Sequence, residues 1–239
     1  MRGLSILIFI GALAGCGGAA DPQPKPEEEI RSEPQPVMGP ERTIMAFGNS
    51  LFAGYGVGEE NSYPAQLEAA LRAQGINAKM VNAGISGDTT AAGLQRLAFT
   101  LDAQETKPEL LLLELGGNDL LRGLSPDQTR ANFVAMLDEL KSREIPVLMM
   151  GMRAPPNYGP EFQAEFDGLY GELAEEYDVA LVPFWMETIY QRPELFQNDR
   201  IHPTTEGLSE LVVATKDAVV AALPELPDDA EAPADASAE

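Results

Sequence analysis

The chain contains one histidine, His202, and an aspartate, Asp199, lies three residues before it. A turn can bring side chains at this spacing together, so the carboxylate can orient the imidazole. An imidazole oriented in this way can act as general base for a serine hydroxyl, which is otherwise a poor nucleophile at neutral pH. Ser50, Ser86 and Ser125 lie in loops after apolar runs and are candidates for the nucleophile. These residue types predict acyl transfer through a serine.

Each of these residues also has a structural interpretation. A single histidine is often a surface or structural residue, and a serine that follows Gly-Asn at the end of a strand, as Ser50 does, is often a helix N-cap. The pairing of His202 with Asp199, directly before Pro203 and ahead of a predicted helix, favours the catalytic interpretation.

Acyl transfer also requires hydrogen-bond donors for the oxyanion that develops on the substrate. Backbone N–H groups at glycine and the side-chain amide of asparagine suit this role. Gly84 and Asn118 are the candidates, because each follows one of the next two apolar runs. The alternative is that Gly84 only permits a turn with positive φ and that Asn118 only caps a loop.

Short apolar runs alternate with helical patterns along the chain. Five runs predict strands at 43–48, 78–82, 109–115, 146–150 and 180–183. Segments with apolar residues at helical spacing predict helices at 63–74, 89–103, 127–143, 161–177 and 204–222. This alternation indicates the α/β class, with a mostly parallel five-stranded sheet covered by helices on both faces. Ligands of such sheets bind beyond the carboxyl ends of the strands, where the candidate residues lie.

Composition excludes several other classes of function. The 239 residues include 38 acidic and 16 basic side chains, which give a formal net charge of −22. A nucleic-acid partner is not expected, because binding to phosphates requires a basic surface. One cysteine and one histidine cannot form a disulfide or a zinc site of His and Cys ligands within one chain.

The first residues predict a lipoprotein signal peptide at 1–15. Arg2 precedes an apolar stretch at 4–14, which is too short to span a bilayer and has the length of a signal-peptide core. The stretch runs into Leu13-Ala14-Gly15-Cys16, which resembles a bacterial lipobox. We therefore expect Cys16, the only cysteine, to carry a lipid anchor that attaches the chain to a membrane. The alternative is ordinary cleavage after residue 14.

The remaining segments complete the predicted organisation. Residues 16–42 are rich in proline and glutamate and predict a disordered tether. Residues 43–223 form the predicted globular domain, and 224–239 form an acidic disordered tail. Because residue 17 is Gly and not the Asp that often retains lipoproteins in the inner membrane, we expect the outer membrane of a Gram-negative envelope, facing the periplasm.

Four segments in sequence order resemble the SGNH or GDSL hydrolase superfamily, and most closely its bacterial thioesterase I, lysophospholipase and arylesterase group. They are Gly48-Asn49-Ser50-Leu51, Gly84, Gly116-Gly117-Asn118-Asp119 and Asp199-Arg200-Ile201-His202-Pro203. The resemblance implies a flavodoxin-like, three-layer α/β/α fold. It also implies that Ser50 is the nucleophile, that His202 is the general base and then the acid, and that Asp199 orients His202.

The resemblance further implies an oxyanion hole made of the Ser50 and Gly84 N–H groups and the Asn118 amide, with no metal or organic cofactor. Two positions depart from the pattern. Asn49 stands where the family usually has Asp, and we expect its side-chain oxygen to preserve the local hydrogen bonding. Leu120 stands where close relatives often have Gly, and we expect it to narrow the mouth of the acyl pocket.

The predicted function is hydrolysis of carboxylic esters, thioesters or lysophospholipids with short to medium acyl chains. Leu51, Phe52, Leu120, Leu121 and Tyr158 are candidates for lining the acyl pocket. Two alternatives stay open: a glycan O-deacetylase that uses the same triad, and a catalytically silent, tethered binding module. The chain lacks the Gly-x-Ser-x-Gly of α/β-hydrolases around Ser50, and it lacks a dinucleotide or P-loop motif.

Overall fold

Parallel strands form the centre of the protein. The computed structural model describes residues 37–226. The strands are β1 (Arg42–Gly48), β2 (Ala78–Gly84), β3 (Leu110–Glu114), β4 (Val147–Met150) and β5 (Ala180–Val182). They form one sheet in the order β2-β1-β3-β4-β5, and every pairing is parallel. This is the strand order of flavodoxin-like folds, in which ligands bind where the order reverses, between β1 and β3.

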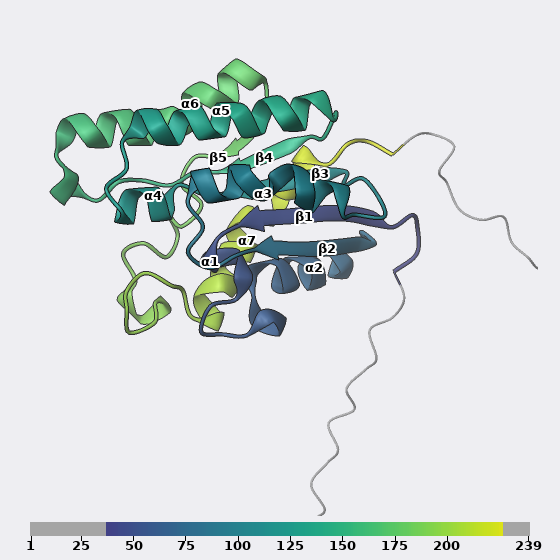
Figure 1. Cartoon of the computed structure of the whole chain (residues 1–239). Helices are drawn as coiled ribbons and strands as arrows, with labels where there is room; N and C mark the ends of the chain where they lie inside the picture. The colour runs from purple at the N-terminus through teal and green to yellow at the C-terminus, as the bar shows by residue number, and fades with distance from the viewer. Residues whose placement is uncertain (1–36, 227–239) are drawn as a thin grey trace, which may run out of the picture. The chain divides into compact units, whose positions relative to one another are not determined.

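Helices cover both faces of the sheet (Figure 1). The long helices are α2 (Tyr63–Ala73), α3 (Thr90–Asp102), α5 (Pro126–Ser142), α6 (Pro160–Tyr177) and α7 (Thr205–Ala222). Helices α3, α5 and α6 lie on one face, and α2 and α7 lie on the other. The predicted three-layer α/β/α fold is therefore confirmed.

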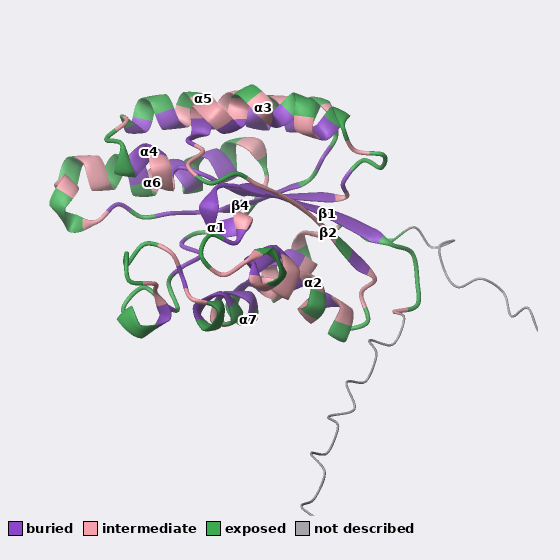
Figure 2. Cartoon of the chain, turned by 60° about the horizontal axis from the view of Figure 1, so that its bottom comes forward, coloured by how far each residue is buried: buried purple, intermediate pink, exposed green. Residues whose placement is uncertain are grey.

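The three inner strands of the sheet are buried because their apolar side chains point to both layers of helices. Every residue of β1, β3 and β4 is buried, and each long helix turns a buried stripe toward the sheet (Figure 2). Four of the five long helices, α2, α3, α5 and α7, begin at a side chain that caps their free N–H groups, whereas α6 begins at a glycine. Ser125, for example, forms a capping box with Gln128 at the start of α5.

The structure adds short elements that the apolar pattern does not predict. Helices α1 (Ser50–Ala53) and α4 (Gly117–Leu121) are each about one turn long. Three 3₁₀ turns, Glu59–Asn61, Pro156–Tyr158 and Pro193–Leu195, lie in the connections. An apolar period cannot reveal elements of this length, because they contain only one turn.

The folded region extends one residue beyond its predicted start. Arg42, predicted to end the tether, lies in β1 and is buried. Its guanidinium pairs with Glu109 at 2.5 Å and donates to the Pro224 carbonyl at 2.6 Å. The predicted signal peptide, Cys16 and most of both predicted tails lie outside the described residues. No helix within 37–226 is long and apolar enough to cross a membrane.

Candidate active site

The predicted nucleophile follows the central strand directly. Asn49 caps α1 by accepting a hydrogen bond from the Leu51 N–H, and this turn places Ser50 at the carboxyl edge of the sheet. Ser50 Oγ lies 2.8 Å from His202 Nε2. Of the three candidate serines, Ser50 is the one whose hydroxyl bonds the histidine. Ser86 lines the same cavity, and Ser125 caps α5.

The histidine is oriented by the aspartate that the sequence indicates. Asp199 Oδ2 lies 2.7 Å from His202 Nδ1, while Asp199 Oδ1 accepts the N–H groups of Ile201 at 2.9 Å and His202 at 3.0 Å. Burial opposes ionisation of Asp199, but the hydrogen bonds from His202 and the two backbone N–H groups outweigh it and lower its pKa to about 2. Because Asp199 is ionised, Nδ1 donates to it, and Nε2 is free to accept the Ser50 proton.

The loop that carries this pair is fixed on both sides. The Gln197 side-chain amide donates to the carbonyls of Tyr55 at 2.8 Å and Pro203 at 3.0 Å. The Tyr55 ring lies 4.3 Å from the His202 ring, centroid to centroid, at an angle of 32°. Arg200 adopts a left-handed backbone conformation, with φ of 59°. These contacts hold His202 against the turn that carries Ser50.

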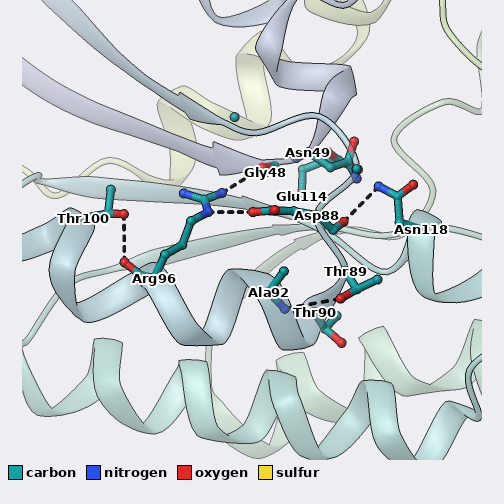
Figure 3. A network of polar contacts seen from close by, with 12 residues as sticks. Gly48, Asn49, Asp88, Thr89, Thr90, Ala92, Arg96, Thr100, Glu114 and Asn118 are labelled. Carbon is teal, nitrogen blue, oxygen red and sulfur yellow. Dashed lines mark hydrogen bonds and ion pairs between the residues drawn. The ribbon is translucent and has the colours of Figure 1, made fainter.

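Asn118 reaches the same edge of the sheet from the start of α4. Its amide donates to the Asp88 carbonyl at 2.9 Å, which fixes the side chain and leaves its second N–H available. Arg96 secures Asp88 through an ion pair of 2.6 Å and also donates to the Gly48 carbonyl at 3.0 Å (Figure 3). The guanidinium lies 3.9 Å above the Phe47 ring. This network ties the loop after β2 to the ends of β1 and β3.

The structure contradicts the prediction that Gly84 donates to the oxyanion. Gly84 ends β2, and its one N–H already donates to the Asn82 side chain at 3.0 Å. Gly84 serves close packing instead, because a Cβ there would lie 2.5 Å from the Ala53 nitrogen. Gly87, three residues later, lines the cavity with Ser50 and Asn118 and has φ of 88°. Within residues 37–226, the Gly87 N–H donates to no backbone carbonyl.

Gly87 is therefore a candidate backbone donor that the sequence analysis does not single out. The signal that could have found it is its place in Ile85-Ser86-Gly87-Asp88, where a turn with positive φ requires a glycine. The predicted strand ended at residue 82, and the observed strand continues to Gly84. The two extra residues move the start of the loop beyond Gly84.

A cavity of about 510 Å³ opens beside Ser50 and His202. Three of the predicted acyl-pocket residues, Leu51, Leu120 and Leu121, are among its lining residues. Two are not. Phe52 is fully buried and stacks on Tyr63, because α1 turns it away from the cavity. Tyr158 donates to the Leu120 carbonyl at 2.6 Å and supports the wall from behind.

Further apolar side chains of this cavity come from the segments after β4 and β5. They are Met152, Pro155, Phe184, Met186, Tyr190, Pro193 and Phe196. The arrangement can hold an apolar group next to an activated serine, with backbone N–H groups and the Asn118 amide as donors. Acyl transfer requires such a combination. Within the described part of the chain, no group of three acidic, His or Cys side chains comes together as a metal site.

Residues 46–208 match the model of the GDSL-like Lipase/Acylhydrolase family. The chain belongs to this family. It is therefore an ester-bond hydrolase, and the family resemblance seen in the sequence is confirmed.

Named relatives and solved structures agree with this assignment. The chain is 40% identical to "Esterase TesA" of Pseudomonas aeruginosa over 171 residues, which is 72% of this chain and 84% of the relative. It is 40% identical over 165 residues to "Thioesterase 1/protease 1/lysophospholipase L1" of Escherichia coli K12, covering 69% and 77%. The crystal structure of AlinE4, an SGNH-hydrolase family esterase, has 61% identity and a TM-score of 0.67, and covers 79% of this chain and 100% of that chain.

One contact of this GDSL-like hydrolase depends on the asparagine at residue 49. Glu114, at the end of β3, is fully buried and accepts the Asn49 amide at 3.1 Å and the Asn49 backbone N–H at 3.3 Å. Burial raises the pKa of Glu114 to about 8, although both hydrogen bonds oppose this. Asn49 Oδ1 remains free for the Leu51 N–H, as the sequence predicts for local hydrogen bonding.

Replacing Asn49 by Asp is expected to make stability fall more steeply as pH rises. In the wild type, the raised pKa of Glu114 stabilises the fold fully below about 4.5, and this contribution is lost as pH rises through about 8. The carboxylate introduced by Asn49→Asp would face Glu114 at the present 3.1 Å, and two carboxyl groups that close cannot both ionise at low cost. Urea unfolding at pH 5, 7 and 9 measures the effect.

The control for this prediction is the double variant Asn49→Asp/Glu114→Gln. It removes the second acid, so the additional loss of stability between pH 5 and pH 9 should disappear. Parallel stability curves for the wild type and Asn49→Asp over the whole range would contradict the prediction.

Proposed function

We propose that Ser50, His202 and Asp199 hydrolyse carboxylic esters and thioesters through an acyl-Ser50 intermediate. The observation that carries this proposal is the unbroken set of contacts from Ser50 Oγ through His202 to Asp199, at 2.8 Å and 2.7 Å. In the first step, His202 Nε2 takes the Ser50 proton while Oγ attacks the substrate carbonyl. Asp199 stabilises the imidazolium that forms.

The oxyanion receives hydrogen bonds from three donors. They are the N–H groups of Ser50 and Gly87 and the side-chain amide of Asn118, all from residues that line the cavity. These donors act where negative charge develops, so they stabilise the transition state more than the substrate. We assign the second backbone donor to Gly87, because the N–H of Gly84 is already bonded.

The intermediate then collapses and is hydrolysed. His202 gives its proton to the leaving alcohol or thiol, and the C–O or C–S bond breaks to leave the acyl group on Ser50. A water molecule loses a proton to His202 and attacks the acyl carbon. Release of Ser50 returns that proton to Oγ and yields the carboxylic acid.

The cavity supports a substrate with a short or medium apolar acyl chain. Its walls are mostly apolar, and its volume of about 510 Å³ lies in the range of small-molecule sites. The relatives are named as an esterase, a thioesterase and lysophospholipase, and an arylesterase. We extend these substrate classes to this chain as part of the proposal.

Hydrolysis of p-nitrophenyl esters from acetate to palmitate by the purified full-length protein tests this function. We expect turnover with a maximum at short or medium chain length. Acetylated glycan should be a poorer substrate than the best ester. Release of acetate from glycan with no turnover of esters beyond acetate would favour the deacetylase, and no turnover of any ester would favour the silent binding module.

We propose in addition that Cys16 carries a lipid that holds the protein at the outer membrane of a bacterial envelope. Support comes from the apolar stretch at 4–14, the lipobox-like residues before Cys16 and the presence of Gly at residue 17. Replacing Cys16 by Ala is expected to move the protein from the membrane fraction to the soluble fraction of cells that express it. Unchanged membrane association of the variant would contradict lipidation.

A further inference from the structure

Arg200 is an isolated cation at the active site. Among residues 37–226, every other Arg and Lys side chain has a carboxylate, amide, carbonyl or aromatic partner. Arg200 has none of these partners, although the chain contains 38 acids and 16 bases. A guanidinium offers five N–H donors and stays charged at all ordinary pH values. Arg200 lines the cavity beside Ser50, and no residue of the described part of the chain uses these donors.

The residues that line the cavity carry positive charge and no negative charge. Its lining contains Arg153 and Arg200 but neither Asp nor Glu. Arg153 lies 5.0 Å from the Phe184 ring and contacts the exposed Glu187 at 3.5 Å, which is a long and solvent-screened pair. An anion that enters this cavity therefore meets two cations, and no carboxylate of the lining repels it.

The backbone gives no reason for an arginine at this position. With φ of 59°, residue 200 lies in the left-handed region, where glycine and asparagine are favoured. Two other non-glycine residues of the described chain have a positive φ. They are Glu144 and Asp178, each with φ of 54°, and both lie just after the carboxyl end of a helix. Arg200 lies between Asp199 and His202 in the chain. Since the backbone conformation does not favour arginine there, we expect a role for its side chain.

The position of Arg200 relates it to the leaving group. His202 must lie within hydrogen-bond distance of the leaving oxygen or sulfur in order to protonate it. Arg200 precedes His202 by two residues in a loop held by Asp199 and Gln197. Because Arg200 and His202 belong to one loop and line the same cavity, we expect the leaving group that His202 protonates to lie toward Arg200.

We propose that Arg200, assisted by Arg153, recognises an anionic group on the leaving alcohol or thiol of the substrate. The recognised chemistry is an oxyacid anion, a carboxylate or a phosphate, whose oxygens accept charge-assisted hydrogen bonds from the guanidinium. This inference rests on the proposed ester hydrolysis and adds the charge of the preferred leaving group. The acyl part stays in the apolar region of the same cavity.

Two esters that differ in this charge and in one methyl group test the proposal. One is para-butanoyloxybenzoate, whose leaving phenol carries a carboxylate, and the other is its neutral methyl ester. We expect Arg200→Gln to lower the ratio of kcat/KM for the anionic ester to that for the neutral ester roughly tenfold, mainly through KM. Arg200→Lys keeps the charge and should restore part of the ratio. Added salt should lower the wild-type ratio, because it screens an exposed charge.

Arg130→Gln is the matched control, because it removes one partly exposed arginine charge that pairs with Glu172 and Glu176 and does not line the cavity. It should leave the ratio unchanged. If Arg200→Gln lowered kcat/KM equally for both esters, the proposal would be overturned and Arg200 would be assigned to loop structure. If Arg200→Gln changed kcat/KM for neither ester, the proposal would be overturned as well. Turnover of the neutral ester by the wild type supports the proposed function in each of these cases, whereas turnover of neither ester would overturn both.

Discussion

Replacing Ser50 by Ala is expected to lower kcat for the best ester by about 10⁴- to 10⁶-fold. The variant keeps the cavity and the donors but has no oxygen to form the acyl intermediate. His202→Ala should cost a similar factor, because without a base Ser50 Oγ keeps its proton. The double variant should be little slower than either single variant, since the two residues act as one unit. Single-turnover and steady-state rates with p-nitrophenyl butyrate measure all three.

Folding of these variants can be checked independently of their activity. Ser50 has a relative exposure of only 9%, and removing its hydroxyl leaves the Asn49 cap of α1 in place. We therefore expect Ser50→Ala to unfold within about 1 kcal/mol of the wild type, as is usual when no cavity or buried charge is created. If Ser50→Ala were fully folded and retained more than a few per cent of the wild-type kcat, Ser50 would not be the nucleophile.

Replacing Asn118 by Ala is expected to lower kcat about 10²- to 10³-fold with little change in KM. The Asn118 amide is anchored by its hydrogen bond to the Asp88 carbonyl, at 2.9 Å, so its orientation does not depend on the substrate. A donor fixed in advance stabilises the oxyanion without reorganisation. The change should appear in kcat, because the ground-state carbonyl carries less charge than the oxyanion.

Asn61→Ala provides a matched control for this loss. The Asn61 amide also donates to a backbone carbonyl, that of Val57 at 3.0 Å, but Asn61 is not among the residues that line the cavity. Its removal should change kcat by less than about twofold while costing a similar side-chain to backbone hydrogen bond. A loss for Asn118→Ala that appears only in KM would indicate a role in substrate binding instead of oxyanion stabilisation.

Much of this fold could be predicted because its signals are local. The strand Leu110–Glu114 has four leucines in a row, which predicts burial on both faces. Four of the five long helices also carry a capping side chain at their start. Asp199 and His202 are close in sequence, so their pairing needs only a turn. Local signals do not distinguish Ser50, Ser86 and Ser125, because each follows an apolar run, and only the tertiary structure brings the Ser50 hydroxyl to His202 Nε2.

The errors arise where tertiary contacts decide the outcome. The sequence predicts Gly84 in a loop, but β2 extends two residues further, to Gly84, and the Asn82 side chain accepts the Gly84 N–H. Whether the Phe52 side chain points into the cavity or into the core depends on α1. This helix has four residues, and no apolar periodicity reveals a helix of that length. In the sequence, Glu114 is the polar residue near the end of a predicted strand. Only the packed structure shows that it is buried and accepts hydrogen bonds from Asn49.

The separation of Ser50 and His202 along the chain determines when the enzyme first becomes active. Their hydrogen bond joins residues 152 positions apart, and α7 follows His202 and packs on α2 through a Tyr63 to Thr215 contact of 2.7 Å. A nascent chain that has emerged only as far as β5 contains the nucleophile and every oxyanion donor but lacks its base. Hydrolytic turnover therefore requires that the chain has been made at least as far as His202, and a chain that ends at β5 cannot hydrolyse esters through this pair of residues.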